Sequence, residues 1–349
     1  MKSVTKLFKG VLILAACFGV YVVGVIVFGT IVEHNFEDKT SLSQNSKNIQ
    51  SISDSTFEFV SWNVGFFGLG EESDFFYDGG VDVFQSKETV QKNMKGVLNL
   101  IKEQSSVDFF LLQEVDSFSW RSHKVNFLDS IAEIKNSFTT HLALNYASFF
   151  VPIPLYNPMG PTFSGLFSMS NFKVKEAIRY DLGTSSNWPK RLFYLKRCFL
   201  TQRIQLEKKE LVVVNIHNSA YDQYGEKKQK EMKKLLQFVD AEYKKGNYVV
   251  VGGDWNQSPP NYKHKEMPAY FLNTHLSNED IPDGWEWVAD VNTPTNRKLD
   301  KPYSKEYSFQ TVIDHFLVSP NVQVDSVSVV NMDFKYSDHQ PVYLKVSLR

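Results

Sequence analysis

Cysteine is nearly absent from this chain, with only Cys17 and Cys198 among 349 residues. Because Cys17 lies in an uncharged apolar segment, neither an intrachain disulfide framework nor a cysteine-rich zinc site is expected. A strong charge of either sign is also absent. The first 32 residues carry three Lys and no acid, which leaves 35 of the 38 Lys and Arg and all 39 Asp and Glu for the remainder, a net charge of −4. That balance argues against a strongly basic nucleic-acid binder, so phosphate recognition must be local or metal-mediated.

A long apolar segment near the start is present. Residues 10–32 hold no charge and are rich in Val, Ile, Leu and Phe, long enough to span a bilayer as a helix. Three lysines precede this segment and acidic residues follow it. Because basic flanks stay cytoplasmic, we expect residues 1–9 to be a cytoplasmic tail, 10–32 an uncleaved single-pass signal anchor, and the rest extracytoplasmic. Residues 14–17, Leu-Ala-Ala-Cys, also match a lipoprotein cleavage box, and that alternative stays open.

The remainder divides into a linker and one domain. Residues 33–55 are rich in polar residues toward their end and are interpreted as a flexible linker. From residue 56 onward, apolar runs of strand length alternate with a few helical patterns, one of which Ser86 can cap. Strands are predicted over 56–64, 107–113, 142–150, 162–168, 173–178, 198–206, 211–217, 248–252, 311–318, 326–331 and 341–346, and helices after Ser86 and over 124–134 and 225–243. Many strands with few helices favour a mixed α+β sandwich with its helices outside.

Several predicted strands end in polar residues. The sequence Gly252-Gly253-Asp254-Trp255-Asn256 follows an apolar run, and its glycines let the backbone turn tightly and approach a ligand. An ordinary Asx turn is the alternative interpretation. Corresponding residues end or follow other strands, and a rigid sheet positions such residues for chemistry. The full set of candidates is Asn63, Glu114, His217, Asp254, Asn256, Asp314, Asp338 and His339. Each alone has an ordinary structural explanation, and it is their joint occurrence that favours a site.

The order of these motifs resembles the endonuclease/exonuclease/phosphatase superfamily, whose fold is that of deoxyribonuclease I. The motifs are Trp62-Asn63, Gln113-Glu114-Val115, Asn215-Ile216-His217, Gly253-Asp254-Trp255-Asn256, Asp314-His315 and Ser337-Asp338-His339-Gln340-Pro341-Val342. The resemblance implies a catalytic domain over residues 56–349. It also implies a four-layer α/β/β/α sandwich of two packed mixed sheets, here preceded by one N-terminal transmembrane helix.

The same resemblance implies metal-assisted hydrolysis of a phosphate ester. Glu114 would be the principal ligand of Mg²⁺, or of Mn²⁺ in its place, with Asn63 and Asp338 beside the ion. Asp254 and Asn256 would orient the nucleophilic water and hold the phosphate. His339 would pair with Asp314, and His217 would lie on the other side of the phosphate. Which histidine acts as base and which as acid stays open.

The substrate also stays open. Nucleic acid, a phospholipid or sphingolipid headgroup and a small phosphate ester all fit, and a catalytically silent surface binding module on the same fold is the alternative function. We expect a monomer. Four cations could meet a substrate phosphate but are interpreted as solvated surface residues: Arg121, Lys196, Arg197 and Arg297. Loop 65–85 is rich in Gly and aromatic residues that could form the wall of a pocket beside the metal, and an ordinary packed surface loop is the alternative. Loop 151–161 is rich in Pro and apolar residues that could contact a bilayer or an apolar headgroup, and packing over the core is the favoured explanation.

Overall fold

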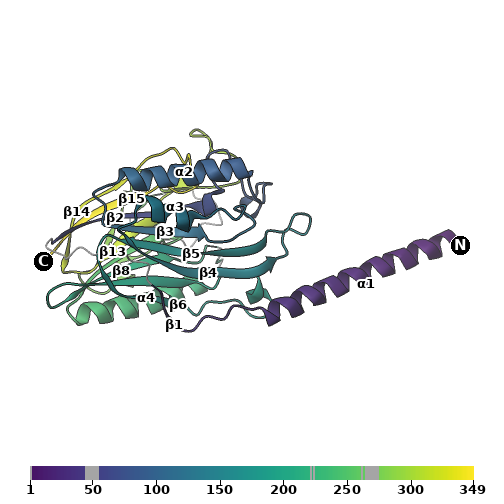
Figure 1. Ribbon diagram of the computed structural model, residues 1–349, viewed down its shortest axis with the longest axis horizontal. Helices are drawn as coiled ribbons and strands as arrows, with labels where there is room; N and C mark the ends of the chain where they lie inside the picture. Colours follow the sequence, from purple (N-terminus) through teal and green to yellow (C-terminus); the bar gives the residue numbers. More distant parts are fainter. Residues whose placement is uncertain (1, 44–54, 221, 223–224, 261, 264–274) are drawn as a thin grey trace.

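The computed structural model describes residues 2–43, 55–220, 222, 225–260, 262–263 and 275–349. Its first element, α1 (Lys2–Ile31), projects away from the rest of the protein, as Figure 1 shows. Within the described part, Lys6–Ile31 is the one helix long and apolar enough to cross a membrane, and its side chains are exposed. A secretory signal sequence near the N-terminus can meet the same criteria of length and hydropathy.

Two mixed sheets form the body of the described domain. One has seven strands in the order β1-β6-β7-β8-β9-β13-β10, and the other has six in the order β14-β15-β2-β3-β5-β4. The pairs β2–β3 and β8–β9 are parallel, whereas the other pairs are antiparallel. The strands are β1 (Lys39–Ser41), β2 (Thr56–Asn63), β3 (Phe109–Asp116), β4 (Thr139–Val151), β5 (Gly160–Ser170), β6 (Val174–Asp181), β7 (Cys198–Gln205), β8 (Glu210–His217), β9 (Tyr248–Asp254), β10 (Glu286–Val288), β13 (Asp314–Val318), β14 (Val322–Val329) and β15 (Val342–Leu348), with β11 (Asn296–Arg297) and β12 (Gln310–Thr311) paired separately.

The sheets pack face to face, and helices cover their outer faces. The core between the sheets draws residues from both, such as Phe59 and Phe109 from one and Val250 and Phe316 from the other. On the outside, α2 (Lys87–Glu103) and α3 (Phe127–Ile134) pack against the six-stranded sheet, and α4 (Glu226–Lys244) packs against the seven-stranded sheet. Figure 1 shows α2 and α4 on opposite faces. This arrangement confirms the predicted four-layer α/β/β/α sandwich.

Local signals in the sequence account for several element boundaries. Ser86 caps α2 as predicted, because its Oγ accepts a hydrogen bond of 3.1 Å from the Thr89 amide. The predicted strand over 311–318 is divided between β12 and β13, since β12 pairs with β11 rather than with the main sheet. Short 3-10 helices cover Gly65–Phe67, Phe76–Asp78, Lys190–Leu192 and Asn278–Asp280.

The segment interpreted as a flexible linker is partly built into the domain. Residues 39–41 form β1, which pairs with β6 at the edge of the seven-stranded sheet. Upstream, the Glu33 carboxylate lies 2.8 Å from Lys196 Nζ and 3.0 Å from Arg191 Nε. Sequence composition did not indicate these contacts because their partners lie more than 130 residues away. The remaining predicted linker, residues 44–54, lies outside the described residues.

Candidate active site

The predicted site residues meet at one edge of the sandwich, which we call the catalytic edge. Asn63 ends β2 and pairs with Gln113 of the parallel strand β3, so Glu114 lies just beyond. His217 ends β8 and is in register with Asp254 at the end of the parallel strand β9. Asp254 in turn pairs with Asp314, the first residue of β13. Because parallel strands end at the same side of a sheet, residues far apart in sequence come together here.

The backbone at this edge is shaped for close approach. Gly253 has φ +155°, and a Cβ built there would lie 2.1 Å from the carbonyl oxygen of Ile216, so only glycine fits between β8 and β9. Glu114 and Asn256 have left-handed φ values of 54° and 50°. Such conformations are unfavourable for residues with a side chain and concentrate at functional sites. The geometry therefore supports the interpretation that the glycines serve to aim Asp254 and Asn256.

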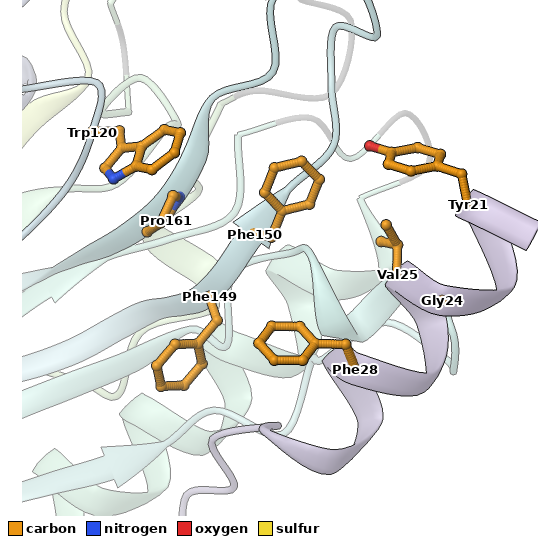
Figure 2. A pocket seen from close by; sticks show the side chains of 8 residues that line it. All are labelled: Tyr21, Gly24, Val25, Phe28, Trp120, Phe149, Phe150 and Pro161. Atoms are coloured by element: carbon orange, nitrogen blue, oxygen red, sulfur yellow. The ribbon is translucent and has the colours of Figure 1, made fainter. Parts of the chain in front are cut away.

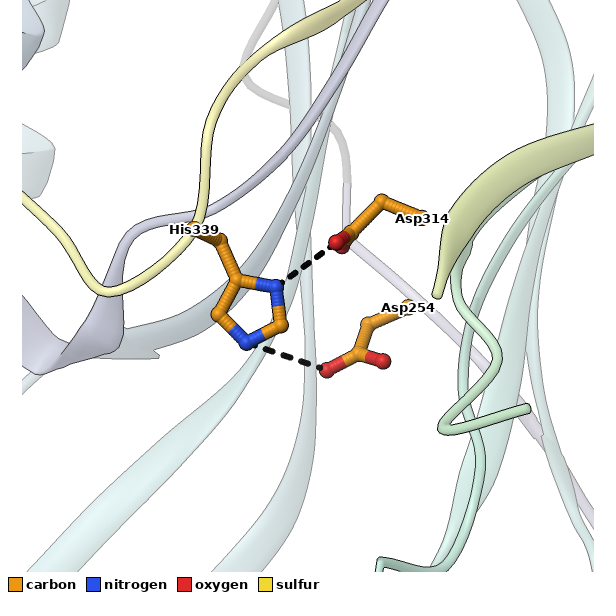
Figure 3. A group of neighbouring side chains, drawn as sticks. All are labelled: Asp254, Asp314 and His339. Atoms are coloured by element: carbon orange, nitrogen blue, oxygen red, sulfur yellow. Dashed lines mark hydrogen bonds and ion pairs between the residues drawn. The ribbon is translucent and has the colours of Figure 1, made fainter. Parts of the chain in front are cut away.

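A histidine bonded between two aspartates lies at the centre of the edge (Figure 3). His339 Nδ1 is 2.8 Å from Asp314 Oδ2, and His339 Nε2 is 3.7 Å from Asp254 Oδ2. The Asp314 carboxylate accepts a hydrogen bond from Nδ1–H of His339. This bond fixes the orientation of the ring, with Nε2 toward Asp254. The main chain of His339 is held in place as well, because Trp62 Nε1 donates a hydrogen bond to the His339 carbonyl at 2.9 Å.

Asn63 of the six-stranded sheet connects carboxylates from both sheets at the catalytic edge. Its Nδ2 donates to Asp254 Oδ2 at 3.0 Å and to Glu114 Oε1 at 3.3 Å. His217 Nε2 approaches the same two carboxylates, at 3.3 Å from Asp254 Oδ2 and 3.9 Å from Glu114 Oε1. Asn256 is close as well, since its backbone N–H donates to Asp254 Oδ1 at 2.9 Å. Its side-chain Nδ2 donates to the Asn218 carbonyl instead. The structure therefore brings together Asn63, Glu114, His217, Asp254, Asn256, Asp314 and His339.

Burial and charge give the two histidines opposite protonation states. Burial and the nearby Arg197 guanidinium lower the pKa of His217 to about 3, which keeps its ring neutral. Burial also acts against a charge on His339, but Asp314, Asp254 and Asp338 outweigh it and hold the pKa of His339 well above its ordinary value. These carboxylates therefore favour the protonated form of the His339 ring, whereas the contact of 2.9 Å with Asn296 Nδ2 is made to Nε2.

The donors around Glu114 fit a hard divalent cation. Asp338 is buried, and burial, with the negative charge of Glu114 nearby, raises its pKa to about 7. A Cβ on Gly65 would lie 2.7 Å from Asp338 Oδ1, so the loop after Asn63 closely approaches this carboxylate. Carboxylates are ligands that Mg²⁺ and Ca²⁺ prefer, so Glu114 and Asp338 fit the predicted ion. The Asn63 amide oxygen accepts from the Gly65 amide at 3.0 Å, and its Nδ2 faces Glu114, so Asn63 lies beside these carboxylates as a donor.

A second donor set overlaps the first. One donor atom each from Asp254, Asp314 and His339 lies within 4.8 Å of the others, close enough to hold a metal ion. Nδ1 of His339 is already bonded to Asp314. This set and the carboxylates of Glu114 and Asp338 are therefore two overlapping candidates for a metal site at the catalytic edge.

Sequence reasoning missed two residues at the edge and misjudged four others. Asn296 Nδ2 lies 2.9 Å from His339 Nε2, and Lys228 Nζ donates to the Asn256 carbonyl at 3.0 Å. Asn296 belongs to a two-residue strand without a motif, and Lys228 is one of several lysines on α4. The four cations interpreted as solvated are in fact buried: Arg121, Lys196, Arg197 and Arg297.

Three of these buried cations already have partners. Arg121 pairs with Asp116 at 2.8 Å, Lys196 with Glu33 at 2.8 Å, and Arg297 donates to the Gly70 carbonyl at 2.6 Å. Buried nitrogens without a hydrogen-bond partner among the described residues are found in Arg297, at Nε, and in Arg197, at Nη1. The charge of Arg197 also lowers the pKa of His217, so of these four cations Arg197 is the one whose charge acts on a predicted site residue at the catalytic edge.

Comparison with known proteins decides the family. A sequence profile of the Endonuclease/Exonuclease/phosphatase family matches residues 60–339. The chain belongs to this family. The match spans every predicted site residue, and it makes the chain a member of a group of phosphoester hydrolases that typically use divalent metals.

Solved structures share the fold at low sequence identity. An endonuclease/exonuclease/phosphatase from Beutenbergia cavernae is 18% identical with a TM-score of 0.58, over 84% of this chain and 72% of its own. TDP2 from D. rerio, complexed with single strand DNA product, is 15% identical with a TM-score of 0.55, over 84% of this chain and 100% of its own. A family protein from Leptotrichia buccalis is 13% identical with a TM-score of 0.54, over 84% and 100%. The comparison with curated protein sequences finds no match.

Proposed function

We propose that this protein is a membrane-anchored, extracytoplasmic, Mg²⁺-dependent phosphoester hydrolase. One observation carries the proposal. At the catalytic edge, the carboxylates of Glu114, Asp254 and Asp338 converge beside an Asp314–His339 pair, and among the described residues no Lys or Arg forms an ion pair with them. Uncompensated buried charge is costly unless a ligand neutralises it, so the cluster fits a site for a cation and a phosphate.

The ion would be held by Glu114 and Asp338, with Asn63 beside them. When bound, Mg²⁺ supplies a positive charge that stabilises the phosphoryl oxygens and makes a coordinated water more acidic. Asn63 holds Glu114 and Asp254 at a fixed separation, because one amide group donates to both carboxylates. Arg197, beside His217, adds a second positive charge for the phosphate.

The remaining residues orient water and carry protons. Asp254 is ionised, since the imidazoles and amide donors beside it outweigh burial and lower its pKa. Its carboxylate is thus the group that orients the attacking water and accepts its proton, with Asn256 fixed next to it. His339, oriented by Asp314 through Nδ1, presents Nε2 to the phosphate. Neutral His217 donates from Nε2 and lies beside the position of the leaving oxygen.

The contacts of α1 support an uncleaved anchor. Trp188 Nε1 donates to Thr30 Oγ1 at 3.2 Å, and Glu33 just beyond the helix pairs with Arg191 and Lys196. These contacts hold the last turn of α1 against the domain. Three lysines at the start of the helix and acids after it favour a cytoplasmic N-terminus with the domain outside.

A substrate panel tests the proposal. The full chain, purified in detergent, is incubated with plasmid DNA, with sphingomyelin or phosphatidylinositol in mixed micelles, and with bis(p-nitrophenyl) phosphate, each with Mg²⁺ and with EDTA. We expect Mg²⁺-dependent hydrolysis of at least one substrate, which Glu114→Ala, Asp254→Ala and His339→Ala each abolish while the far-ultraviolet circular dichroism spectrum stays the same. No Mg²⁺-dependent hydrolysis of any substrate would favour a silent binding module.

A further inference from the structure

A group of large apolar side chains is exposed at the end of the domain next to α1. Their exposed fractions lie between 45% and 77%. They come from the loop after β3, the β4–β5 hairpin and the segment before Lys190. We call this group the aromatic rim: Phe118, Trp120, Phe149, Leu155, Tyr156 and Trp188. Scattered exposed apolar residues are ordinary, but a contiguous group indicates an interaction surface.

Two residues of the aromatic rim, Trp120 and Phe149, face α1 (Figure 2). An apolar cleft of about 440 Å³ lies between the helix and the domain, lined by Tyr21, Gly24, Val25 and Phe28 of the helix and by Trp120, Phe149, Phe150 and Pro161 of the domain. Trp188 is held at the last turn of the helix by its hydrogen bond to Thr30. The β4–β5 hairpin, at Phe149, Phe150 and Pro161, thus lies opposite Tyr21–Phe28 of the helix.

The residues of α1 that face the aromatic rim indicate how deep the rim would lie in a bilayer. Tyr21 lies ten residues before Ile31, the last residue of the helix, which corresponds to about 15 Å along the helix axis. A bilayer core about 30 Å thick takes up about 20 helical residues. If the uncharged segment 10–32 crosses the membrane, the side chains opposite Tyr21–Phe28 lie at the level of the outer leaflet. They cannot be in bulk water in that arrangement.

The catalytic edge is at this same end of the sandwich. Glu114 lies near the end of β3, and Phe118 and Trp120 follow it in the next turn. The Ser117 amide donates to the Phe163 carbonyl and the Trp120 amide to the Pro161 carbonyl, each at 2.9 Å, so the chain continues toward the rim without turning back. Arg121, 3.9 Å from the centroid of the Phe66 ring, joins this loop to the segment after Asn63.

We propose that the aromatic rim is a docking surface for the outer leaflet of the bilayer that α1 spans, and that it holds the catalytic edge against the lipid headgroups. This inference rests on the proposed anchoring by α1. Trp and Tyr are suited to the role because their rings combine an apolar body with a polar group and collect at the headgroup level. A soluble protein partner is disfavoured because it would have to share the plane of the bilayer with α1.

Fluorescence quenching in vesicles tests this inference on the full chain. The background is Cys17→Ser, since Cys198 is buried and should resist labelling. Leu155→Cys places a nitrobenzoxadiazole label on the rim. Lys208→Cys places it in the β7–β8 turn, at the end of β8 opposite His217, as the matched control. Both proteins are reconstituted into phosphatidylcholine vesicles with and without doxyl-labelled lipid.

We expect doxyl lipid to quench the label at residue 155 several-fold more than the label at residue 208, with a blue-shifted emission. Equal quenching at both positions, in protein that stays with the vesicles after a carbonate wash, would overturn the docking surface and leave the anchor intact. Release of the protein by the wash would overturn the anchor and the docking surface together. Hydrolysis of bis(p-nitrophenyl) phosphate by both labelled proteins reports separately on the proposed chemistry.

Discussion

Two clusters of carboxylates, one around Arg203 and one at the catalytic edge, differ in how their charge is balanced. In the first, which we call the Arg203 cluster, Arg203 lies 2.8 Å from Glu242, 2.9 Å from Glu210 and 3.3 Å from Glu176. Lys175 and Lys245 complete it, each 2.7–2.8 Å from a carboxylate. The catalytic edge, by contrast, gathers Glu114, Asp254, Asp314 and Asp338 around histidines, with no Lys or Arg in an ion pair to them among the described residues.

The difference shows how a structural cluster can be told from a functional one. In the Arg203 cluster every charge has a partner, and hydrogen bonds from Arg203, Lys245 and Asn247 outweigh burial and lower the pKa of Glu242 to about 2. At the catalytic edge, burial raises the pKa of Asp314 to about 6 and that of Asp338 to about 7. The first cluster has the charge balance of a structural network, and the second has the perturbed carboxylates that the proposed function associates with a bound cation.

The largest effect is expected at the catalytic edge. His339→Asn removes the imidazole that Asp314 orients, and general acid–base or hydrogen-bond catalysis of this kind contributes about 10²–10⁴-fold in rate. We expect a loss of that size in the Mg²⁺-dependent hydrolysis of bis(p-nitrophenyl) phosphate. His123→Asn is the matched control, because His123 bonds only the Gln85 carbonyl, at 2.7 Å. Equal losses in both variants would remove His339 from the chemistry.

The next effect concerns stability and the Arg203 cluster. Glu242→Gln removes a buried charge that Arg203 and Lys245 both contact, and breaking a buried pair costs about 3 kcal/mol. Denaturant unfolding in detergent should show this loss while the rate of hydrolysis stays the same. Lys244→Gln is the control, since its pair with Asp240 is exposed and is worth under about 1 kcal/mol. A stability unchanged by Glu242→Gln would contradict the structural role.

A third prediction concerns acid sensitivity away from both clusters. Burial lowers the pKa of His141 to about 4, and its Nδ1 accepts from Gln202 Nε2 at 2.8 Å. Between pH 6.5 and 4 the unfolded chain takes up a proton that the native chain does not, so the folded state loses stability as pH falls. At pH 5 this amounts to about 2 kcal/mol. His141→Asn should reduce the difference in unfolding free energy between pH 7 and pH 5 by that amount. An unchanged difference would contradict the depressed pKa.

The smallest expected effect is a gain in stability when a carboxylate of the catalytic edge is neutralised. Glu114→Gln removes one of the uncompensated carboxylates, so in EDTA the variant should be more stable than the wild type by about 1 kcal/mol, or about 2–4 °C in Tm. Differential scanning fluorimetry measures the shift. A lower Tm of Glu114→Gln in EDTA would show that Glu114 is a structural carboxylate like Glu242.

The sequence predicted the fold well because most strands can be recognised from local runs of apolar residues. Apolar runs such as 211–217 and 248–252 match β8 and β9, and polar residues at their ends mark the catalytic edge since parallel strands finish together. What could not be predicted depends on partners distant in the chain. β1 is three residues paired to β6, and Asn296 meets His339 through an isolated bridge. No local pattern distinguishes buried Lys228 from its solvated neighbours on α4.

The most direct test of the central claim is the rate of bis(p-nitrophenyl) phosphate hydrolysis as Mg²⁺ is titrated into the wild type and Glu114→Gln. The account predicts a saturable Mg²⁺ dependence in the wild type. In the variant it predicts a loss of about 10²–10³-fold, equivalent to the several kcal/mol that a metal ion contributes to charge stabilisation. A wild-type rate that is the same in EDTA, or a variant that keeps the wild-type rate and Mg²⁺ dependence, would contradict it.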